Sequence, residues 1–511
     1  MTRFPSTASW PRLLGGAVLF ALFSTALAVA QGPVEAPTPE APEASDGAPE
    51  SSPAADDDPP MWVTAPLYDV APSSHDGAFE QWALARYHNT PVFVAMGPEA
   101  WGLGIVRRGS VLRARLRSQG PGCDGHWFEL EQGGYVCSTR GFRVRTQQQA
   151  RVGDEAEPPN FEALLPYRYG RVVSQDAFRY EDLPTQAQRD RLAAGVSMPG
   201  VAEKLVGDYF VTIDGEVEHE GHNYVRTVAG RYVDAEYIGD HARTELHGEL
   251  LDDDVTLPLA FVIDDETPSY RVSPEGLVAE GTAPKYTRFR PTGLVTRGEV
   301  TCVLTAEGAC IPRDSLRVVW AIDRPSGVPA GERWVHVNLS EQTLVAYHGD
   351  RPLFATIITS GKEGYDTPEG TYRIQHKYLS IRMSGDDPVE GVYDVDEVPW
   401  TMYYHRGYAL HGAYWHDGFG RVRSHGCTNI APADARWLYR WTTPHVPRGW
   451  HGRREEGTWV HNTTGGTAPL GVIDVAPDLL PEDPDTATAS ASGISPTADE
   501  ASDWIPTPSA R

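Results

Sequence analysis

Apolar and polar residues alternate along several short segments in the C-terminal third of the chain. Alternation with a period of two is typical of a β-strand that buries one face. Strands are predicted over residues 334–339, 343–347, 352–359 and 370–374. Strands that follow one another at this spacing predict a sandwich or a closed sheet.

One segment has the pattern of a helix, at residues 432–441. Pro432 suits the first helical position, and Asp434 lies where the positive end of the helix dipole favours an acid. Apolar residues then lie at i, i+1 and i+4 from position 437, which gives one apolar stripe. One or two short helices, of which this segment is one, are therefore predicted against a β-sandwich.

The middle of the chain contains a weak internal repeat, at residues 126–142, 223–238 and 302–316. Each copy predicts a strand, a glycine turn, a second strand and a short turn that ends in an apolar residue. The pattern resembles small bacterial SH3-like barrels, and the alternative is one irregular β-rich domain. With either interpretation the predicted fold class is mainly β.

The N-terminus has the layout of a cleavable secretory signal. Arg3 and Arg12 precede an apolar run that ends in the small-x-small pattern Ala28, Val29 and Ala30. The alternative is an uncleaved membrane anchor, although the run is short for a bilayer span. We expect an exported protein that is soluble after cleavage, in the periplasm or cell envelope.

Six regions follow from these patterns. Two of them are rich in Pro, Ala and acidic or small polar residues and are expected to be disordered. The predicted regions are a signal peptide (1–30), a disordered acidic linker (31–60), a β-rich module resembling SH3 barrels (61–160), a β-rich region with further such modules (161–330), a catalytic domain (331–464) and a disordered tail (465–511).

The net charge and the cysteine content limit the classes of function that the chain can have. The chain has 511 residues, with 44 Lys and Arg against 70 Asp and Glu, a formal charge of -26. This field repels phosphate, which argues against a nucleic-acid binder. Four of the five cysteines form two close pairs, expected to be disulfides in an oxidising compartment: Cys123 with Cys137 and Cys302 with Cys310.

The fifth cysteine, Cys427, lies in a stretch that also contains His411 and His425. A cysteine nucleophile needs an imidazole within hydrogen-bond reach, and the dipole of the helix predicted at residue 432 would favour its thiolate. Gly426 lets the backbone bend so that amide groups face a reacting carbonyl. If His411 ends one strand and the segment 424–427 ends its neighbour, the loop between them brings His411 to the thiol.

Two other interpretations of these residues stay open at this point. A lone cysteine is often an inert core residue. A zinc site built from His405, His411, His425 and Cys427 is the other alternative, although its spacing fits no common ligand pattern.

Two separated motifs resemble the L,D-transpeptidase family, also called YkuD-type catalytic domains. One is Ser-His-Gly-Cys at residues 424–427 with His-Gly at 411–412, and the other is Thr-Ser-Gly at 359–361 followed by the segment 366–372. The resemblance covers residues 333–464. It implies a β-sandwich that needs neither metal nor organic cofactor.

The resemblance also implies roles for individual residues. Cys427 matches the nucleophile, and His411 matches the imidazole that withdraws and returns its proton. His425 and Gly426 match the residues beside the nucleophile, near the oxyanion site. The positions that match substrate contacts or loop-shaping residues are Ser424, Gly412 and Asn429. Tyr414, Trp415 and His416 are interpreted as loop or cleft wall.

The implied reaction is acyl transfer between peptidoglycan stem peptides. The thiolate attacks the third-residue carbonyl of a tetrapeptide stem, D-alanine leaves, and an amine of a second stem gives a 3→3 cross-link. Water as acceptor would make the enzyme a carboxypeptidase, and an envelope protein as acceptor would be attached to the wall. A wall-binding scaffold without activity is the third hypothesis. If His411 is the base, activity should fall in acid near pH 6.5 unless its pKa is shifted.

Overall fold

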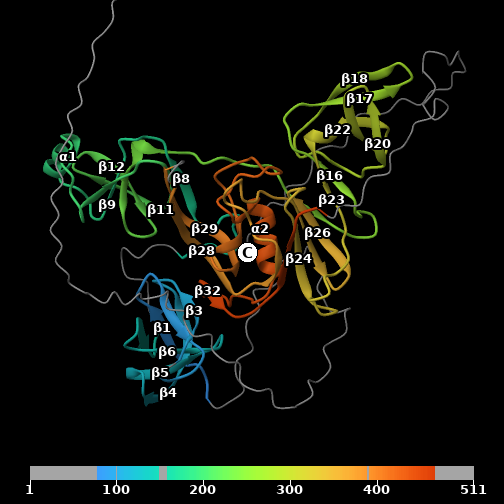
Figure 1. Cartoon of the computed structure of the whole chain (residues 1–511). Coiled ribbons are helices and arrows are strands. Elements are labelled where there is room, and N and C mark those ends of the chain that lie inside the picture. The colour runs from blue at the N-terminus through green and yellow to red at the C-terminus, as the bar shows by residue number, and fades with distance from the viewer. Residues whose placement is uncertain (1–76, 99, 149–157, 388–390, 466–511) are drawn as a thin grey trace, which may run out of the picture. The chain divides into compact units, whose positions relative to one another are not determined.

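The computed structural model describes residues 77–98, 100–148, 158–387 and 391–465, and it is mainly β, as predicted (Figure 1). Its two α-helices are α1 (Gln186–Ala193) and α2 (Pro432–Trp441). The predicted signal peptide, linker and nearly all of the predicted tail lie outside the described residues. Within the described ranges, no helix has the length and hydropathy needed to cross a bilayer.

All four strands predicted in the C-terminal part are present, and they belong to one six-stranded sheet. In spatial order the sheet contains β15 (Glu249–Leu250), β26 (Arg351–Ile357), β25 (Thr343–His348), β24 (Arg333–Asn338), β33 (Trp459–Thr463) and β27 (Gly370–Arg373). Strand β24 lies at the centre, and its Trp334, Val335 and Val337 have no exposed surface. Their burial makes this strand part of the core on both faces.

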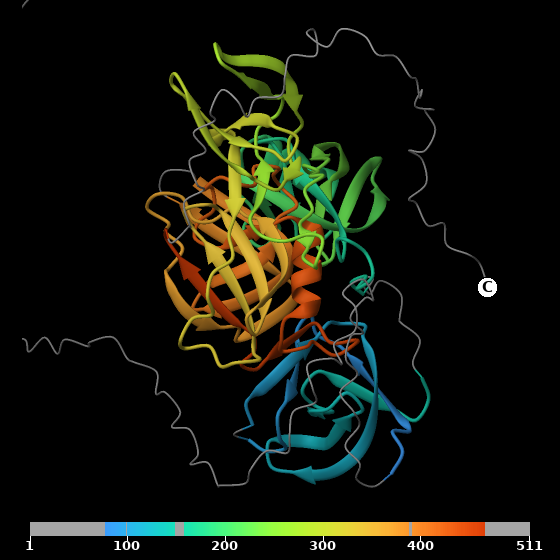
Figure 2. The same cartoon turned by 90° about the vertical axis from the view of Figure 1, so that its right-hand side faces the viewer.

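A second layer is formed by strands that the sequence analysis did not predict. They are β28 (His376–Asp387), β29 (Gly391–His405), β30 (Tyr408–Gly412), β31 (Thr428–Ile430) and β32 (Gly452–Arg454). Helix α2, which begins and ends at the predicted residues, lies between the two layers (Figures 1 and 2). Its Leu438 shares the core with Met402 and Leu410, and its Trp437 stacks on Phe354 of β26 at 4.3 Å.

The N-terminal described part is an antiparallel unit of seven strands, the β1–β7 unit. Its strands are β1 (Gln81–Ala85), β2 (Thr90–Phe93), β3 (Gly102–Val106), β4 (Val111–Gly120), β5 (Cys123–Leu130), β6 (Tyr135–Cys137) and β7 (Phe142–Arg145). Strand β1 pairs with both β4 and β7. A disulfide between Cys123 and Cys137 joins β5 to β6, the hairpin of the first sequence repeat.

The next part, the β8–β14 unit, contains the second repeat. Its strands are β8 (Arg168–Val172), β9 (Phe178–Tyr180), β10 (Ala202–Lys204), β11 (Asp208–His219), β12 (His222–Thr227), β13 (Tyr232–Asp234) and β14 (Ile238–Gly239). Helix α1 also belongs to it and was not predicted. Thr185 and Gln188 form a capping box at its start, but only Leu192 is buried, so the helix has little apolar periodicity.

The third repeat lies in two small sheets. These contain β16 (Leu259–Val262), β17 (Thr267–Ser273), β18 (Gly276–Ala283), β19 (Arg288–Phe289), β20 (Gly293–Arg297), β21 (Val300–Leu304), β22 (Ala309–Pro312) and β23 (Leu316–Val319). A disulfide joins Cys302 of β21 to Cys310 of β22. The SH3-like character of the three repeats stays a prediction.

Strand β29 is attached to both units that precede the C-terminal sheets. Arg107, which follows β3, pairs with Glu397, and Arg179 of β9 pairs with Asp394 at 2.9 Å. All four side chains are less than 8% exposed. Strand β11 of the β8–β14 unit also pairs with β29 in parallel. The last contact brings the β8–β14 unit to the edge of the site described next.

Candidate active site

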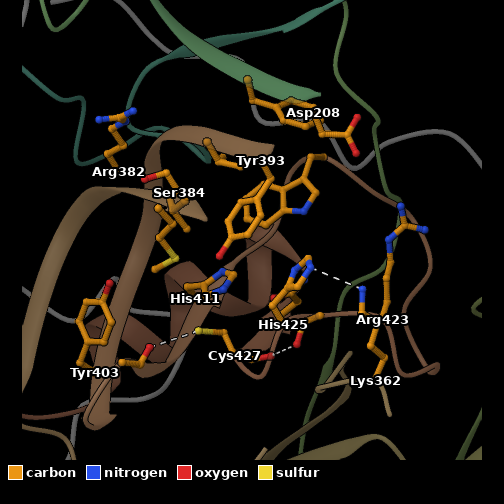
Figure 3. Close-up of a pocket in the computed structure, with 18 of the residues that line it drawn as sticks. Asp208, Lys362, Arg382, Ser384, Tyr393, Tyr403, His411, Arg423, His425 and Cys427 are labelled. Carbon is orange, nitrogen blue, oxygen red and sulfur yellow. Dashed lines mark hydrogen bonds between the residues drawn. The ribbon is translucent and has the colours of Figure 1, made fainter. Parts of the chain in front are cut away.

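Cys427 and His411 are brought together by two parallel strands, β30 and β31. The register places His411 opposite Asn429 and Leu410 opposite Thr428, so Cys427 lies directly before β31. The sequence predicted the Cys427 segment at the end of a strand; it instead forms the turn that enters one. Both side chains face one pocket, where the imidazole lies beside the sulfur (Figure 3).

The pocket has a volume of about 760 Å³ and takes its walls from three parts of the chain. One wall is the turn before β31, the second is the β28–β29 hairpin, and the third is the start of β11. The lining residues include Asp208, Phe210, Lys362, Arg382, Met383, Tyr393, Tyr403, His411, Trp415, Arg423, Ser424, His425, Cys427 and Asn429. The volume is in the range typical of small-molecule and peptide sites.

Cys427 is a free and partly exposed thiol in the structure. Its Sγ lies 3.6 Å from the carbonyl oxygen of Gly407, to which it donates (Figure 3). Burial raises the pKa of Cys427 to about 11, and a backbone hydrogen bond at Ala409 offsets only part of this. This raised pKa favours the neutral thiol at rest, whereas the helix dipole was expected to favour a thiolate.

His411 is also neutral and is almost fully buried. Its Nδ1 lies 3.2 Å from the carbonyl oxygen of Gly412. A carbonyl only accepts, so Nδ1 carries the proton and Nε2 is left as an acceptor. Burial lowers the pKa of His411 to about 4. The ring therefore keeps its acceptor nitrogen well below pH 6.5, and the acid limit expected from an ordinary histidine moves to about pH 4.

The turn that carries Cys427 is held by Ser424. Its Oγ accepts from the Gly426 amide at 3.1 Å and donates to the Cys427 carbonyl at 2.5 Å. Gly426 has φ +112°, and a Cβ there would lie 2.7 Å from the Tyr408 ring, so glycine is required. The Gly426 amide is thus bonded within the turn.

The upstream motif braces the same turn from the other side. Thr359 and Asn429 exchange two backbone hydrogen bonds of 2.9 and 2.7 Å. Thr367 Oγ1 donates to the Gly426 carbonyl at 2.7 Å and accepts from the Gly361 amide at 3.0 Å. The two separated sequence motifs thus meet in space, and the upstream one has a structural task.

His425 contributes to the wall of the pocket. Its ring stacks on Tyr393 at 4.8 Å and meets Tyr365 edge-on at 4.9 Å. Its Nε2 lies 3.5 Å from Lys362 Nζ. These contacts orient the ring of His425 toward the β28–β29 hairpin and leave His411 as the imidazole beside the thiol.

The remaining predicted site residues divide into two groups. Asn429 lines the pocket with Ser424, and its side-chain amide lies 3.0 Å from His416 Nε2. Gly412 and Gly426 are not among the lining residues, and a Cβ on Gly412 would lie 3.2 Å from Pro399. Gly412 therefore permits close packing of β30 rather than contact with a ligand.

The zinc alternative finds no support in the arrangement of these side chains. His405 is not among the lining residues of the pocket, and its ring packs on Tyr372 at 4.7 Å. Among the residues that the structure describes, no three His, Cys, Asp or Glu side chains are grouped so that they could hold a metal ion.

Several pocket residues were not found by sequence reasoning. Arg382, Met383 and Tyr393 come from the β28–β29 hairpin, and Asp208 and Phe210 come from β11. Alternation in the segment 391–395 was the one local signal for β29. No local pattern links β11 to a cysteine more than two hundred residues further along the chain.

Comparison with known proteins agrees with this site. Residues 332–465 match the YkuD family, the L,D-transpeptidase catalytic domain. The chain is 35% identical over 119 residues to L,D-transpeptidase 2 of Mycobacterium tuberculosis, a match that covers 21% of this chain and 26% of that protein. The matched part thus spans about a quarter of the length of that relative.

Two solved structures are also similar to parts of the chain. The catalytic domain of the E. faecium L,D-transpeptidase acylated by ertapenem is 24% identical, with 27% of this chain and 100% of that chain covered and a TM-score of 0.22. An L,D-transpeptidase from Mycobacterium smegmatis is 18% identical, with 44% and 94% covered and a TM-score of 0.22. From the family match and the curated relative, residues 332–465 of this chain form an L,D-transpeptidase catalytic domain of the YkuD type.

Proposed function

We propose that the chain is a peptidoglycan L,D-transpeptidase that uses Cys427 as nucleophile and His411 as its proton acceptor and donor. The observation that carries the proposal is the neutral thiol and the neutral imidazole facing one pocket, with Nε2 of His411 left to accept a proton. Such a pair can start acyl transfer without a metal ion or an organic cofactor.

In the first half-reaction the Sγ–H proton of Cys427 passes to Nε2 of His411 as sulfur attacks the third-residue carbonyl of a donor stem. The C–S bond forms, and the C–N bond to the terminal D-alanine then breaks. The imidazolium returns its proton to the leaving amine, so D-alanine departs and a thioester remains. Because the Gly426 amide is held by Ser424, we assign the oxyanion to the amide of Cys427 itself.

In the second half-reaction a side-chain amine of another stem attacks the thioester. The C–N bond forms and the C–S bond breaks, while the amine proton passes through His411 back to the sulfur. The product is a 3→3 cross-link. Water in place of the amine would give a trimmed stem, and an amine of an envelope protein would give a wall attachment.

The charges around the pocket support an anionic peptide as substrate. Lys362, Arg382 and Arg423 line it, although the chain has a formal charge of -26. Stem peptides carry several carboxylates, and a locally cationic wall on an acidic protein attracts them selectively. Asp208 at the far side is the acidic exception.

An extracytoplasmic location is part of the proposal. The family acts on the cell wall, and the two disulfides fit an oxidising compartment. The signal peptide expected over residues 1–30 is consistent with this route.

The experiment is mass spectrometry of muropeptides after incubation with the purified full chain. Wild type should release D-alanine and produce 3→3 dimers, and Cys427→Ser should produce neither. Trimmed stems without dimers would favour the carboxypeptidase. No change in the muropeptides, together with no labelling of Cys427 by a carbapenem, would favour the scaffold and contradict the proposal.

A further inference from the structure

The ring of His411 packs on an aromatic stack that joins two parts of the chain. The His411 ring lies on Trp415, with ring centres 5.6 Å apart and planes inclined by 30°. Phe210 of β11 lies next to Trp415, at 6.2 Å, and next to Tyr414, at 6.0 Å. Phe210 and Tyr414 are nearly buried and share one hydrophobic cluster, against which Trp415 packs.

From this geometry we infer that the β8–β14 unit is an integral part of the active site, in which Phe210 positions His411 through Trp415. This inference rests on the proposed function, because it assigns a task to residues around the same imidazole. Phe210 lies outside the segment that matches the catalytic-domain family, so the contribution comes from a part of the chain that precedes that segment.

Phe210 is held in place by backbone pairing. Strand β11 runs parallel to β29, with Asp208 opposite Tyr393 and Phe210 opposite Val395. Side chains two residues apart share a face, so Asp208 and Phe210 both point into the pocket. Gly207 begins this contact at φ +128°, where a Cβ would overlap the Val392 carbonyl oxygen.

The opposite face of β11 is fastened by polar contacts. Tyr209 lies opposite Asp394, which binds Arg179 of the β8–β14 unit at 2.9 Å. On the same face as Phe210, Tyr169 Oη donates to the Glu397 carbonyl at 2.7 Å, and its ring packs on Tyr414 at 4.1 Å. Both faces of the junction are thus packed, so the position of Phe210 is set by β29 rather than by a mobile surface contact.

The stack has two physical consequences for His411. It limits the orientations of the ring, so that Nε2 stays directed toward the thiol. It also keeps water from the ring, and this burial disfavours the imidazolium. Loss of the Phe210 ring should therefore both lower the turnover number and raise the pKa of the imidazole.

Other charged groups near His411 contribute less to this effect. Cys427 faces it from the turn before β31, and His416 lies on its own loop. The remaining titratable side chains around the pocket, from β11, the β28–β29 hairpin and the loops, are Asp208, Lys362, Arg382, Tyr393, Tyr403, Arg423 and His425. Burial is the main cause of the low pKa of His411, so the aromatic cover is the feature to change.

The test compares Phe210→Leu and Trp415→Leu with the ring-preserving Phe210→Tyr and Trp415→Phe in the full chain. Phe178→Leu is the matched control, because it removes a partly buried ring from the same unit, on β9, away from the pocket. The measurements are the kcat and KM of acyl transfer, the pH dependence of Cys427 alkylation by iodoacetamide, and the NMR titration of His411.

The leucine variants should lower kcat about tenfold with KM changed less than about twofold, and should raise the apparent pKa of His411 by about one unit. The ring-preserving variants and Phe178→Leu should stay near wild type. If Phe210→Leu matches Phe178→Leu in both kcat and His411 titration, the inference is wrong. The titration and the alkylation need no peptidoglycan, so they test the inference even if wild type shows no acyl transfer, a result that would instead overturn the proposed function.

Discussion

The β1–β7 and β8–β14 units are attached to strand β29 in the same manner but differ in what they contribute. Each inserts one buried arginine, Arg107 or Arg179, against a carboxylate of β29. Among the described residues, those that line the Cys427 pocket include two from the β8–β14 unit and none from the β1–β7 unit. A buried ion pair therefore shows that a unit is attached to β29. Residues that line the pocket are the evidence that a unit takes part in the chemistry.

The attachments beyond the ion pairs explain the difference. The β1–β7 unit pairs β3 with β32, through Gly104 opposite Arg453. The β8–β14 unit pairs β11 with β29, whose residues Tyr393 and Val395 line the pocket. Strand β29 thus belongs both to the core and to the pocket. The β8–β14 unit pairs with the part of β29 that lines the pocket, so its residues also line the pocket.

The largest loss of activity is expected from a change to His411 in the pocket, and the variants of the two units are compared with that loss. His411→Asn removes the proton acceptor and should lower the rate of acyl transfer by about a thousandfold or more. His461→Asn is the control, since this half-buried histidine of the same domain lies outside the pocket and bonds Thr371. Steady-state release of D-alanine measures both, and a His411→Asn variant within tenfold of wild type would contradict the assignment.

The comparison is tested directly by removing each arginine. Arg107→Met leaves Glu397 without its nearest cation, whereas Arg179→Met leaves Asp394 paired with Arg382 alone. The first change should cost roughly 3–5 kcal/mol of stability in denaturant unfolding, and the second should cost less. At a temperature where both variants are folded, Arg179→Met should lose acyl-transfer activity and Arg107→Met should keep it. Equal activity in the two folded variants would remove the distinction between the units.

A smaller effect on stability is expected from Asp396, which lies where β11 meets β29. Burial, and secondly the charge of Asp394, raise the pKa of Asp396 to about 7. When the pKa of a carboxyl is higher in the folded than in the unfolded protein, the folded protein is most stable below about pH 4, where the group is protonated in both states. This stability is lost as the pH rises to about 7. The free energy of unfolding of Asp396→Asn, relative to wild type, should therefore be about 2–4 kcal/mol higher at pH 8 than at pH 4.

Urea unfolding of both proteins at several pH values provides the measurement. A difference between Asp396→Asn and wild type that does not change between pH 4 and pH 8 would show that Asp396 titrates as an ordinary surface acid. Asp396 packs at the β11 edge, where its carboxylate accepts from the Thr212 amide at 3.4 Å.

The smallest effect is expected at Ser424, in the turn that carries Cys427. Ser424→Ala removes the bonds to Gly426 and Cys427 and should cost about 1–2 kcal/mol of stability and a few-fold in kcat. Ser340→Ala, in an exposed turn of the same domain, is the control. Thermal unfolding and D-alanine release should show the Ser424 variant weaker than the control, and equal behaviour would mean that the upstream motif alone holds the turn.

Local signals explain what the sequence predicted well. Helix α2 begins at Pro432, as its Pro and Asp434 indicate, and β24 to β27 lie at the alternating segments. The location of His411 and Cys427 at one pocket was also anticipated from the motif. These features depend on residues that are close in the chain or on a pattern with one period.

Strand β28 alternates between apolar and polar residues over 379–384, a local signal that was overlooked, whereas strand β29 was missed because most of its signals are not local. Strand β29 contains Asp394, Asp396 and Glu397, which would be exposed in an ordinary strand but are buried here. Asp394 is paired with Arg382 of the neighbouring strand β28 and with Arg179, 215 residues before it, and Glu397 is paired with Arg107, 290 residues before it.

The central claim is that Cys427 forms the acyl-enzyme. The most direct measurement is to mix the full chain with a disaccharide-tetrapeptide donor, quench it in acid within the first turnovers, and map the modified peptide by mass spectrometry. The account predicts an adduct on Cys427 with the mass of the donor minus D-alanine, absent from Cys427→Ser. D-alanine release by wild type without this adduct, or the same adduct on another residue, would contradict it.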